Sequence, residues 1–218
     1  MQMARIILDF GSGNTCRNDW QYVKRMLDEL KAVDTGKHEI IIKHQLFLQA
    51  GENIPLDRKI FEAAYIYAEQ LGYKTTASVF DKESLDFLLQ FDVPFVKIAN
   101  RRELDWLIGE VPRRVPILVS LDKKAEGEYA LYIRLTGEIS QFDRYLCCVS
   151  NYPAKIKDYE RTFKFWDLQQ GISDHTTDFE LWEKCQPKII EWHYKLEDST
   201  GLDAGPFART PTQLAEVL

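Results

Sequence analysis

Two histidines near the end of the sequence are the residues best suited to metal chemistry. Residues 171–176 read Gly-Ile-Ser-Asp-His-Thr and residues 189–194 read Ile-Ile-Glu-Trp-His-Tyr, so His175 and His193 each follow a short apolar approach and a carboxylate. Such an approach is typical of a strand in an α/β protein that delivers side chains to the carboxyl edge of its sheet. Two imidazoles on neighbouring strands could hold one divalent metal and leave positions open for water and substrate oxygens. The alternative is that either histidine is a packed strand-end residue.

Polar residues also follow the other apolar runs, and two of these residues are Lys43 and Lys97. An unpaired ammonium in a protein interior is costly, so lysines at the ends of buried strands indicate an anionic ligand. Serines and Asn100 could donate hydrogen bonds to its phosphate or carboxylate oxygens. The alternative is an internal salt bridge, for example between Lys43 and Asp9. The polar strand-end residues are Asp9, Lys43, Gln45, Ser78, Lys97, Asn100, Ser120, Ser150, Tyr152, Ser173, Asp174, His175, Glu191 and His193.

A parallel sheet would bring strand-end side chains to one edge, and the sequence predicts eight strands that alternate with helices. The predicted strands cover residues 5–9, 39–43, 75–79, 94–97, 116–120, 145–149, 171–173 and 189–191. Helices are predicted over residues 20–32, 57–71, 82–90 and, as a short one, 102–109. The alternation and the number of strands predict a small (β/α)8 TIM barrel in a single domain over residues 1–218.

One stretch after Ser120 breaks the alternation. Residues 122–136 combine aromatic and β-branched side chains with flanking glycine, a composition that favours a hairpin over a helix. We therefore expect the fifth helix of the barrel to be missing or replaced by a hairpin.

The composition excludes several classes of protein. Hydrophobic residues make up 45% of the 218 residues, enough for a full core, and the net charge of −6 argues against a nucleic-acid partner. A run of about 18 apolar residues, as a membrane span needs, is missing, and the first residues do not read as a signal peptide. The four cysteines show no Cys-x-x-Cys spacing and are expected as buried thiols. These features predict a soluble cytoplasmic protein.

The motifs together resemble the catalytic barrel of the sialic acid synthase family, which comprises N-acetylneuraminate synthases and their legionaminate and pseudaminate relatives. The resemblance runs from about residue 6 to the end of the chain. The Ser-Asp-His-Thr and Ile-Ile-Glu-x-His pair at this spacing is its most specific part. Further matches are residues 149–154, 201–203 and, more loosely, 43–45, 78–81 and 97–100.

The resemblance implies an enzyme that condenses phosphoenolpyruvate with an N-acylated hexosamine such as N-acetylmannosamine. The product would be a nine-carbon 2-keto sugar acid, with release of phosphate. His175 and His193 would bind Mn²⁺ or Mg²⁺, and Asp9 and Glu191 would take part in catalysis. Phosphoenolpyruvate would be surrounded by Lys43, Ser78, Lys97, Asn100, Ser120, Ser150 and Ser173, and the sugar would face Gln45, Tyr152 and Asp203. A homodimer is one assembly that the resemblance allows.

The sequence departs from the family pattern at several places. Asp9 stands where the family has glutamate, and Thr15 stands where it usually has histidine. The usual serine and glutamate after the fourth strand are replaced by Asn100 and Arg102, and the usual Thr-Gly after Ser120 by Leu-Asp. The sequence ends at Leu218, without the C-terminal antifreeze-like domain that contacts the sugar in the family. We therefore expect a more open mouth and weak sugar discrimination, unless residues 122–136 form a substitute lid.

Three functional hypotheses follow from the residues and the resemblance. The first is an active phosphoenolpyruvate-dependent synthase of sialic acid type. The second is a degenerate barrel that binds phosphoenolpyruvate or a sugar without catalysis. The third is a related synthase that uses another aldehyde.

Overall fold

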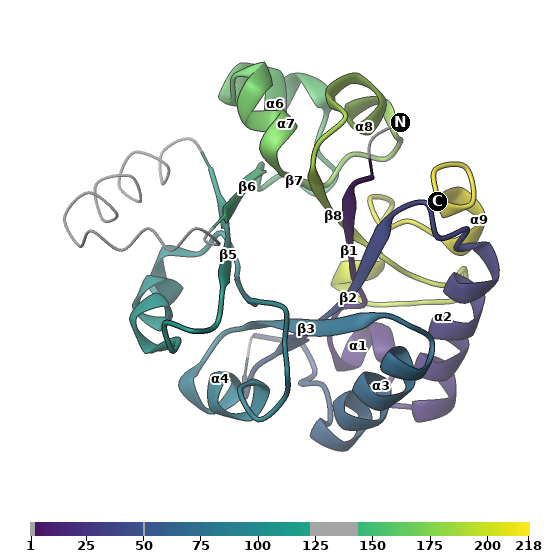
Figure 1. The fold of residues 1–218 in the computed structure, drawn as a ribbon, viewed down its shortest axis with the longest axis vertical. Coiled ribbons are helices and arrows are strands. Elements are labelled where there is room, and N and C mark those ends of the chain that lie inside the picture. Colours follow the sequence, from purple (N-terminus) through teal and green to yellow (C-terminus); the bar gives the residue numbers. More distant parts are fainter. Residues whose placement is uncertain (1–2, 50, 123–143) are drawn as a thin grey trace.

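The strands form one closed, parallel barrel in the order β1 to β8 (Figure 1). This computed structural model describes residues 3–49, 51–122 and 144–218. Each strand pairs with the next in parallel, and β8 pairs with β1 to close the barrel. The prediction of an eight-stranded TIM barrel is therefore confirmed. The strands are β1 (Arg5–Asp9), β2 (Glu39–Leu46), β3 (Lys74–Val79), β4 (Val96–Ile98), β5 (Ile117–Leu121), β6 (Arg144–Cys148), β7 (Ile172–Asp174) and β8 (Ile189–His193).

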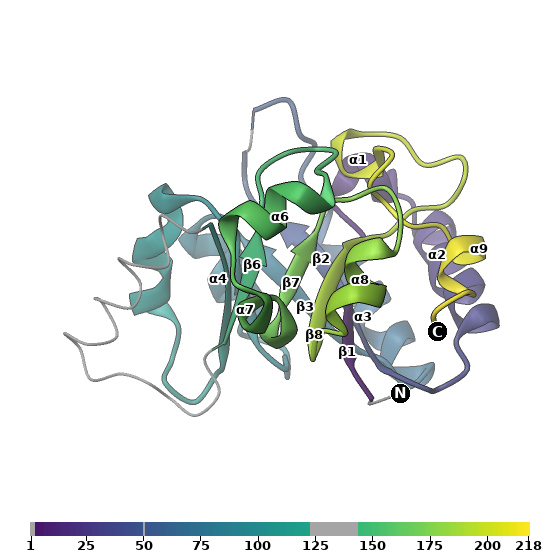
Figure 2. The same ribbon diagram turned by 90° about the horizontal axis from the view of Figure 1, so that it is seen from above.

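Helices surround the barrel, and Figure 2 shows the short α1 at the end where the strands finish, opposite the N-terminus. The longest, α2 and α3, contact each other outside the first strands. The helices of the described residues are α1 (Gly13–Cys16), α2 (Trp20–Val33), α3 (Arg58–Gln70), α4 (Lys82–Leu88), α6 (Ile156–Thr162), α7 (Phe165–Gln170), α8 (Glu180–Cys185) and α9 (Pro211–Leu214), with 3₁₀ helices η1 (Arg102–Glu110) and η2 (Leu202–Ala204).

Aspartates fix the starting points of α2, α3 and α4. The side chains of Asp19, Asp57 and Asp81 each accept a hydrogen bond from a backbone N–H in the first turn of α2, α3 and α4. Such N-caps satisfy amide groups that have no partner within the helix. The sequence thereby limits the length of the loops that follow β1, β2 and β3.

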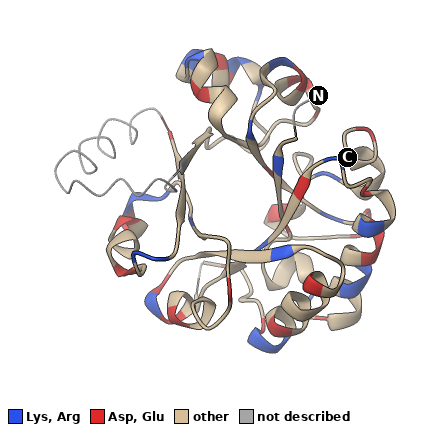
Figure 3. Ribbon diagram, viewed as in Figure 1, with Lys and Arg blue, Asp and Glu red and all other residues tan. Residues whose placement is uncertain are grey.

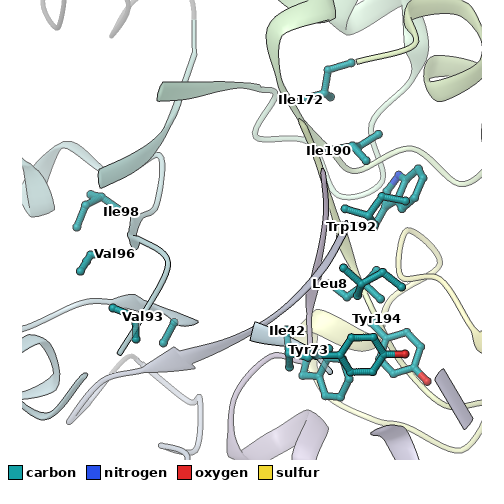
Figure 4. Close-up of a cluster of buried hydrophobic side chains, with 14 of the residues drawn as sticks. Leu8, Ile42, Tyr73, Val93, Val96, Ile98, Ile172, Ile190, Trp192 and Tyr194 are labelled. Atoms are coloured by element: carbon teal, nitrogen blue, oxygen red, sulfur yellow. The ribbon is translucent and has the colours of Figure 1, made fainter. Parts of the chain in front are cut away.

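Each strand is buried on both faces, as a parallel barrel requires. Outward side chains pack beneath the helices, and Figure 4 shows Leu8, Ile42, Ile190 and Trp192 among them. Inward side chains form a separate apolar layer inside the barrel. Its members are Ile7, Ile41, Phe95, Leu118, Leu146 and Ile189. Because side chains alternate along a strand, the next inward position lies two residues further toward the carboxyl end.

Several predicted boundaries were wrong. The second strand continues past Lys43 to Leu46, because Gln45 pairs with Ser78 and its N–H donates to Gly11 O at 2.9 Å. The fourth strand begins only at Val96, because Pro94 has no N–H to offer a neighbouring strand. The sixth, seventh and eighth strands are Arg144–Cys148, Ile172–Asp174 and Ile189–His193, shifted or extended relative to the prediction. The predicted short helix after β4 is the 3₁₀ helix η1, and α1, α6 and α7 were not predicted.

The hairpin predicted over residues 122–136 falls, apart from Asp122, outside the described residues. Within the described ranges, both signs of charge are interspersed over the outer helices, and the strands carry few charged residues (Figure 3). None of the helices in these ranges combines the length and apolar character that a bilayer span demands.

Candidate active site

A cavity of about 610 Å³ lies at the carboxyl ends of the strands. Its floor is the layer directly above the apolar interior, where each strand places its next inward residue. These floor residues are Asp9, Lys43, Lys97, Ser120, Cys148 and Glu191. The change from an apolar to a polar layer within two residues creates a site that is closed below and open toward the loops.

The structure places every residue with a predicted catalytic, substrate-binding or metal-binding role in the lining of this one cavity, whereas the strand-end residue Asp174 lies outside it and binds Trp192 and Arg209. The predicted residues in the lining are Asp9, Lys43, Gln45, Ser78, Lys97, Asn100, Ser120, Ser150, Tyr152, Ser173, His175, Glu191, His193 and Asp203. The side chains come from all eight strands or the loops directly after them. Their convergence is a property of the structure, whereas their individual roles are still predictions.

Lys43 and Asp9 form a buried ion pair on neighbouring strands. Lys43 Nζ lies 2.7 Å from Asp9 Oδ2 and donates to Ser78 Oγ at 3.1 Å, while Gln45 Nε2 donates to the same carboxylate at 2.9 Å. Burial favours neutral Asp9, but the ammonium of Lys43 and the imidazole of His193 outweigh it and hold the pKa of Asp9 well below its usual range. The salt bridge that we considered as an alternative is therefore present, inside the cavity.

The second buried lysine has weaker electrostatic support. Lys97 Nζ donates to Ser120 Oγ at 2.7 Å and to Ile98 O at 3.1 Å, but its nearest carboxylate, Glu191 Oε2, is 3.9 Å away. Burial lowers the pKa of Lys97, and Glu191 offsets only part of that effect. An anionic ligand at this position would restore the balance in favour of the charged ammonium. Lys97 is thus the floor cation whose charge is least compensated by its described neighbours.

His175 is held as a neutral imidazole with one nitrogen committed to the backbone. Its Nδ1 lies 2.8 Å from Val149 O, and because a carbonyl only accepts, Nδ1 carries the proton. Burial lowers the pKa of His175 to about 3, with His193 contributing in the same direction. The lone pair on Nε2, 3.4 Å from Ser173 Oγ, is then available to a metal ion.

Two carboxylates lie close to one ring nitrogen of His193. Its Nδ1 lies 3.6 Å from Asp9 Oδ2 and 3.4 Å from Asp203 Oδ1, and it has no hydrogen-bond partner among the described residues. Gln45 Nε2 donates to Asp203 Oδ1 at 3.1 Å, which holds this carboxylate over the cavity. Burial raises the pKa of Asp203, and the neighbouring charge of Asp9 adds to the effect although His193 opposes it. A buried imidazole nitrogen without a hydrogen-bond partner among the described residues, close to two carboxylates, is a favourable environment for a cation.

Two potential ligand sets for a divalent metal share His193. Its ring centroid is 5.6 Å from that of His175, the predicted partner. Ligand atoms of Asp9, His193 and Asp203 all lie within 4.8 Å of one another, so the structure adds two carboxylates that the metal prediction did not include. Imidazole and carboxylate donors suit Mn²⁺, and carboxylate donors suit Mg²⁺. The residues present therefore fit a divalent metal on the side of the cavity formed by β8.

The mouth of the cavity is formed by residues in the loops. Asn100 Nδ2 donates to Ser150 Oγ at 3.1 Å, and the Asp122 N–H donates to Asn100 Oδ1 at 3.2 Å, so two predicted residues form one linked rim. The half-exposed Tyr152 ring lies 4.1 Å from the ring of His175. A flat ring beside an imidazole can form one wall of a binding pocket. The mouth of the cavity is therefore both polar and aromatic.

Sequence reasoning missed Cys148 and Phe207 as cavity residues. Cys148 was expected only as a buried thiol, although it stands two positions after the inward Leu146 and therefore also faces inward. Burial raises its pKa to about 12, which keeps it as a neutral thiol. Phe207 lies in a loop, and its ring centroid is 5.0 Å from His193 and 5.2 Å from Tyr152. No periodic pattern marks such a loop residue in the sequence.

The sequence matches the family model described as "NeuB family" over residues 24–218. It is 23% identical to the human N-acetylneuraminate-9-phosphate synthase over 165 residues, which cover 70% of this chain and 45% of the relative. It is 25% identical to the pseudaminic acid synthase of Campylobacter jejuni over 198 residues, covering 81% of this chain and 56% of the relative. The matched part thus spans about half the length of these curated relatives.

Solved structures with the same fold include an N-acetylneuraminic acid synthetase from Leptospira borgpetersenii in complex with citrate. That match has a TM-score of 0.78 at 23% identity and covers 99% of this chain and 81% of the other. A truncated 3-deoxy-D-arabino-heptulosonate 7-phosphate synthase from Thermotoga maritima has a TM-score of 0.63 at 12% identity, covering 98% and 83%. At these identities the likeness establishes the barrel fold.

Proposed function

Because the chain belongs to the NeuB family, we propose that it is a synthase that condenses phosphoenolpyruvate with an N-acylated hexosamine. The product would be a nine-carbon 2-keto sugar acid of sialic or pseudaminic type, with phosphate as the second product. Both product types are named among the relatives of the chain. In this proposal the whole domain over residues 1–218 acts as one catalytic barrel.

The observation that carries this proposal is the composition of the cavity floor. Two buried lysines, Lys43 and Lys97, face one cavity together with the hydroxyl groups of Ser78, Ser120 and Ser173. A small ligand with a phosphate and a carboxylate would satisfy these donors, and charge-assisted hydrogen bonds of this kind are stronger than neutral ones. Asn100 and Ser150 would complete the anion site at the rim.

The other substrate would lie nearer the mouth. Gln45 and Asp203 offer an amide and a carboxylate to sugar hydroxyls, and Tyr152 offers a ring face. His175 and His193 would hold Mn²⁺ or Mg²⁺, with Asp203 as a further oxygen ligand beside His193. When bound, this ion supplies Lewis-acid polarisation of the sugar's aldehyde oxygen.

The C2–C3 π electrons of phosphoenolpyruvate form a bond between C3 and the aldehyde carbon, the C=O π bond of the aldehyde breaks, and its oxygen takes up a proton to become a hydroxyl. Water then adds at C2, and the C–O bond to phosphate breaks. Glu191 is suited to move the proton of that water, because its Oε2 is buried and has no hydrogen-bond partner in the described part of the chain. Lys97, 3.9 Å from Glu191, would stabilise negative charge on the departing phosphate, and Asp9 would stabilise positive charge that develops at C2.

The proposal is tested by mixing the protein with phosphoenolpyruvate, N-acetylmannosamine and Mn²⁺. We expect inorganic phosphate and a 2-keto acid to appear in equal amounts, measured by colorimetry and NMR. Phosphoenolpyruvate bound without phosphate release, over a panel of aldehydes, would instead favour a binding barrel without catalysis. Release with other aldehydes only would favour a related synthase.

The anion site is tested separately by calorimetry. Lys97→Met should weaken phosphoenolpyruvate binding by about 1.5–3 kcal/mol, the range for hydrogen bonds to charged groups. Lys184→Met is the matched control, because Lys184 is exposed and pairs with Glu160 outside the cavity. Equal affinities of the two variants for phosphoenolpyruvate would show that Lys97 has a structural role only.

A further inference from the structure

Arg209 is a fully buried arginine that does not line the cavity. It lies in the segment between β8 and α9. Its guanidinium contacts the rings of Phe179 and Trp192, with Cζ 4.9 and 5.9 Å from the two ring centroids, which are themselves 5.3 Å apart. A buried guanidinium needs several acceptors. Those of Arg209 lie in residues 174–178, around His175, and at Phe207 O, whereas its backbone N–H reaches His193 O.

The guanidinium holds the loop that follows β7. Arg209 Nη1 donates to Thr176 O at 2.9 Å, and Nη2 donates to Asp178 O and lies 3.4 Å from Asp174 Oδ2. Asp174 and Thr176 flank His175 in the sequence. The loop is therefore fixed on both sides of this histidine by one side chain.

The backbone N–H of Arg209 and the carboxylate of Asp174 also bind the end of β8. The Arg209 N–H donates to His193 O at 2.7 Å, and Trp192 Nε1 donates to the Asp174 carboxylate at 2.8 Å. Nη1 also lies 3.3 Å from the carbonyl of Phe207, whose ring centroid is 5.0 Å from His193 and 6.2 Å from His175. Arg209 thus connects the loop after β7, which contains His175, to the end of β8, which contains His193.

This arrangement is not an efficient way to stabilise a fold. A buried ion pair is often no more stabilising than a packed apolar pair, and Arg209 Nε has no hydrogen-bond partner among the described residues. What a planar guanidinium provides is a rigid fork that fixes several acceptors relative to one another, which a lysine ammonium cannot do. The geometry of the acceptors is therefore the property that Arg209 controls.

We propose that Arg209 is a positioning residue that sets the spacing of His175 and His193 and thereby the affinity of the site for a divalent metal. This inference rests on the proposed function, because it assumes that the two histidines bind the ion. Arg209 touches neither substrate nor metal and acts through the loop after β7 and the end of β8. Groups of this kind, one step removed from the ligands, change metal affinity by about 10–100-fold when they are altered.

The test compares Mn²⁺ binding to the wild type and to Arg209→Lys, by electron paramagnetic resonance titration at a temperature where both are folded. We expect the dissociation constant to rise by about 10–100-fold, because the ammonium can pair with Asp174 but cannot hold the carbonyls of Thr176 and Asp178. Arg5→Lys is the control, since Arg5 pairs with Glu39 at 2.9 Å at the opposite end of the barrel. Its affinity for Mn²⁺ should equal that of the wild type.

A second readout needs no metal. In ¹⁵N spectra of the metal-free protein, His175 should show a single Nδ1–H tautomer in the wild type and in Arg5→Lys, and mixed tautomers in Arg209→Lys. If Arg209→Lys does not fold, Asp174→Asn combined with Arg209→Gln removes both charges and is measured in its place. Wild-type Mn²⁺ affinity and an unchanged tautomer in the folded variant would overturn the inference alone. A wild type that binds no Mn²⁺ would overturn the metal assignment and this inference with it.

Discussion

Lys43 Nζ lies 2.7 Å from Asp9 Oδ2, and each of the two side chains is only 2% exposed. The pair joins β1 to β2 at the floor of the cavity, in the register that matches Asp9 with Lys43. A residue that we propose as an anion ligand is thus also half of an internal ion pair. The two roles predict different effects, and stability measurements can separate them from ligand binding.

Removal of one partner of this pair should destabilise the protein more than removal of both. Lys43→Met leaves a buried carboxylate without its cation, so we expect a loss of about 3–5 kcal/mol in the free energy of unfolding. The double variant Asp9→Asn with Lys43→Met should lie much closer to the wild type. Urea denaturation of the four proteins of this cycle provides the measurement. Additive losses would show that the two charges do not interact.

The two ligand sets for the metal predict different sensitivities. His193 belongs to both, and we propose His175 as its partner, so His175→Ala and His193→Ala should each abolish Mn²⁺-dependent turnover while the fold persists. Asp203→Asn should weaken Mn²⁺ binding without abolishing it. His38→Asn is the control, because His38 is a buried histidine at the amino end of the barrel, opposite the cavity. There its Nδ1 accepts a hydrogen bond from the Ala4 N–H. Retained Mn²⁺ binding in His175→Ala, with binding lost in Asp203→Asn, would place the ion on the carboxylate set instead.

His44 should make the protein less stable in mild acid. It is fully buried on the outer side of β2 between the rings of Phe10 and Phe61, and burial lowers its pKa from 6.5 to about 4. Between these two values the unfolded chain binds a proton that the folded protein does not, so the free energy of unfolding falls as the pH falls from 6.5 to 4. At 1.36 kcal/mol per pKa unit, His44 alone lowers the free energy of unfolding by about 3 kcal/mol over this pH range.

The measurement compares unfolding at pH 7 and at pH 4.5 in the wild type and in His44→Phe. The variant should lose less stability on acidification, because an aromatic ring of similar shape takes no proton. His175, whose pKa burial also lowers, is present in both proteins and cancels in the comparison. Identical losses of unfolding free energy in the two proteins would show that His44 does not cause the acid sensitivity.

Gly201 should be required for the position of Asp203. Its φ of 100° and ψ of 173° are accessible almost only to glycine, and a Cβ there would lie 2.7 Å from Asn14 Cβ. Gly201→Ala should therefore push away the η2 segment that carries Asp203 and lower kcat/KM for the sugar by roughly 10- to 100-fold. Gly72→Ala is the matched control, because Gly72 also has a positive φ, of 89°, but has open space around it.

In this comparison both alanine variants should lose stability through backbone strain of about 1–3 kcal/mol. Only Gly201→Ala should also lose sugar turnover. Equal turnover in the two variants would mean that the η2 segment adapts without moving Asp203.

The sequence by itself determined which side of each strand carries chemistry. The apolar run Ile40–Ile42 ends at Lys43, and the period of two places Lys43 and Gln45 on the same face of β2. The two histidine motifs show the same change from apolar to polar residues at the ends of β7 and β8. Because all strands of a parallel barrel end at the same rim, these local patterns were enough to predict that their inward polar residues share one cavity. Asp174 at the end of β7 is the exception, because it lies outside the cavity and binds Trp192.

Only the tertiary structure decided which of these groups meet. Lys43 pairs with Asp9 and is not an unpaired ammonium in the cavity. This pairing depends on strand register and barrel closure, which involve residues far apart in the chain. The end of β2 at Leu46 has the same origin, because its last residues pair with β3 and would otherwise read as a polar loop.

The loops show the limit of local patterns most clearly. Asp203 reaches the cavity because Gly201 packs against Asn14 of α1, and Arg209, which no pattern in the sequence marks, is fully buried because acceptors from residues 174–178 and from Phe207 surround its guanidinium. A loop has no hydrophobic period to reveal where its side chains point. Its path is set by contacts with distant segments, so the part of the site that lies beyond the strands exists only in the folded barrel.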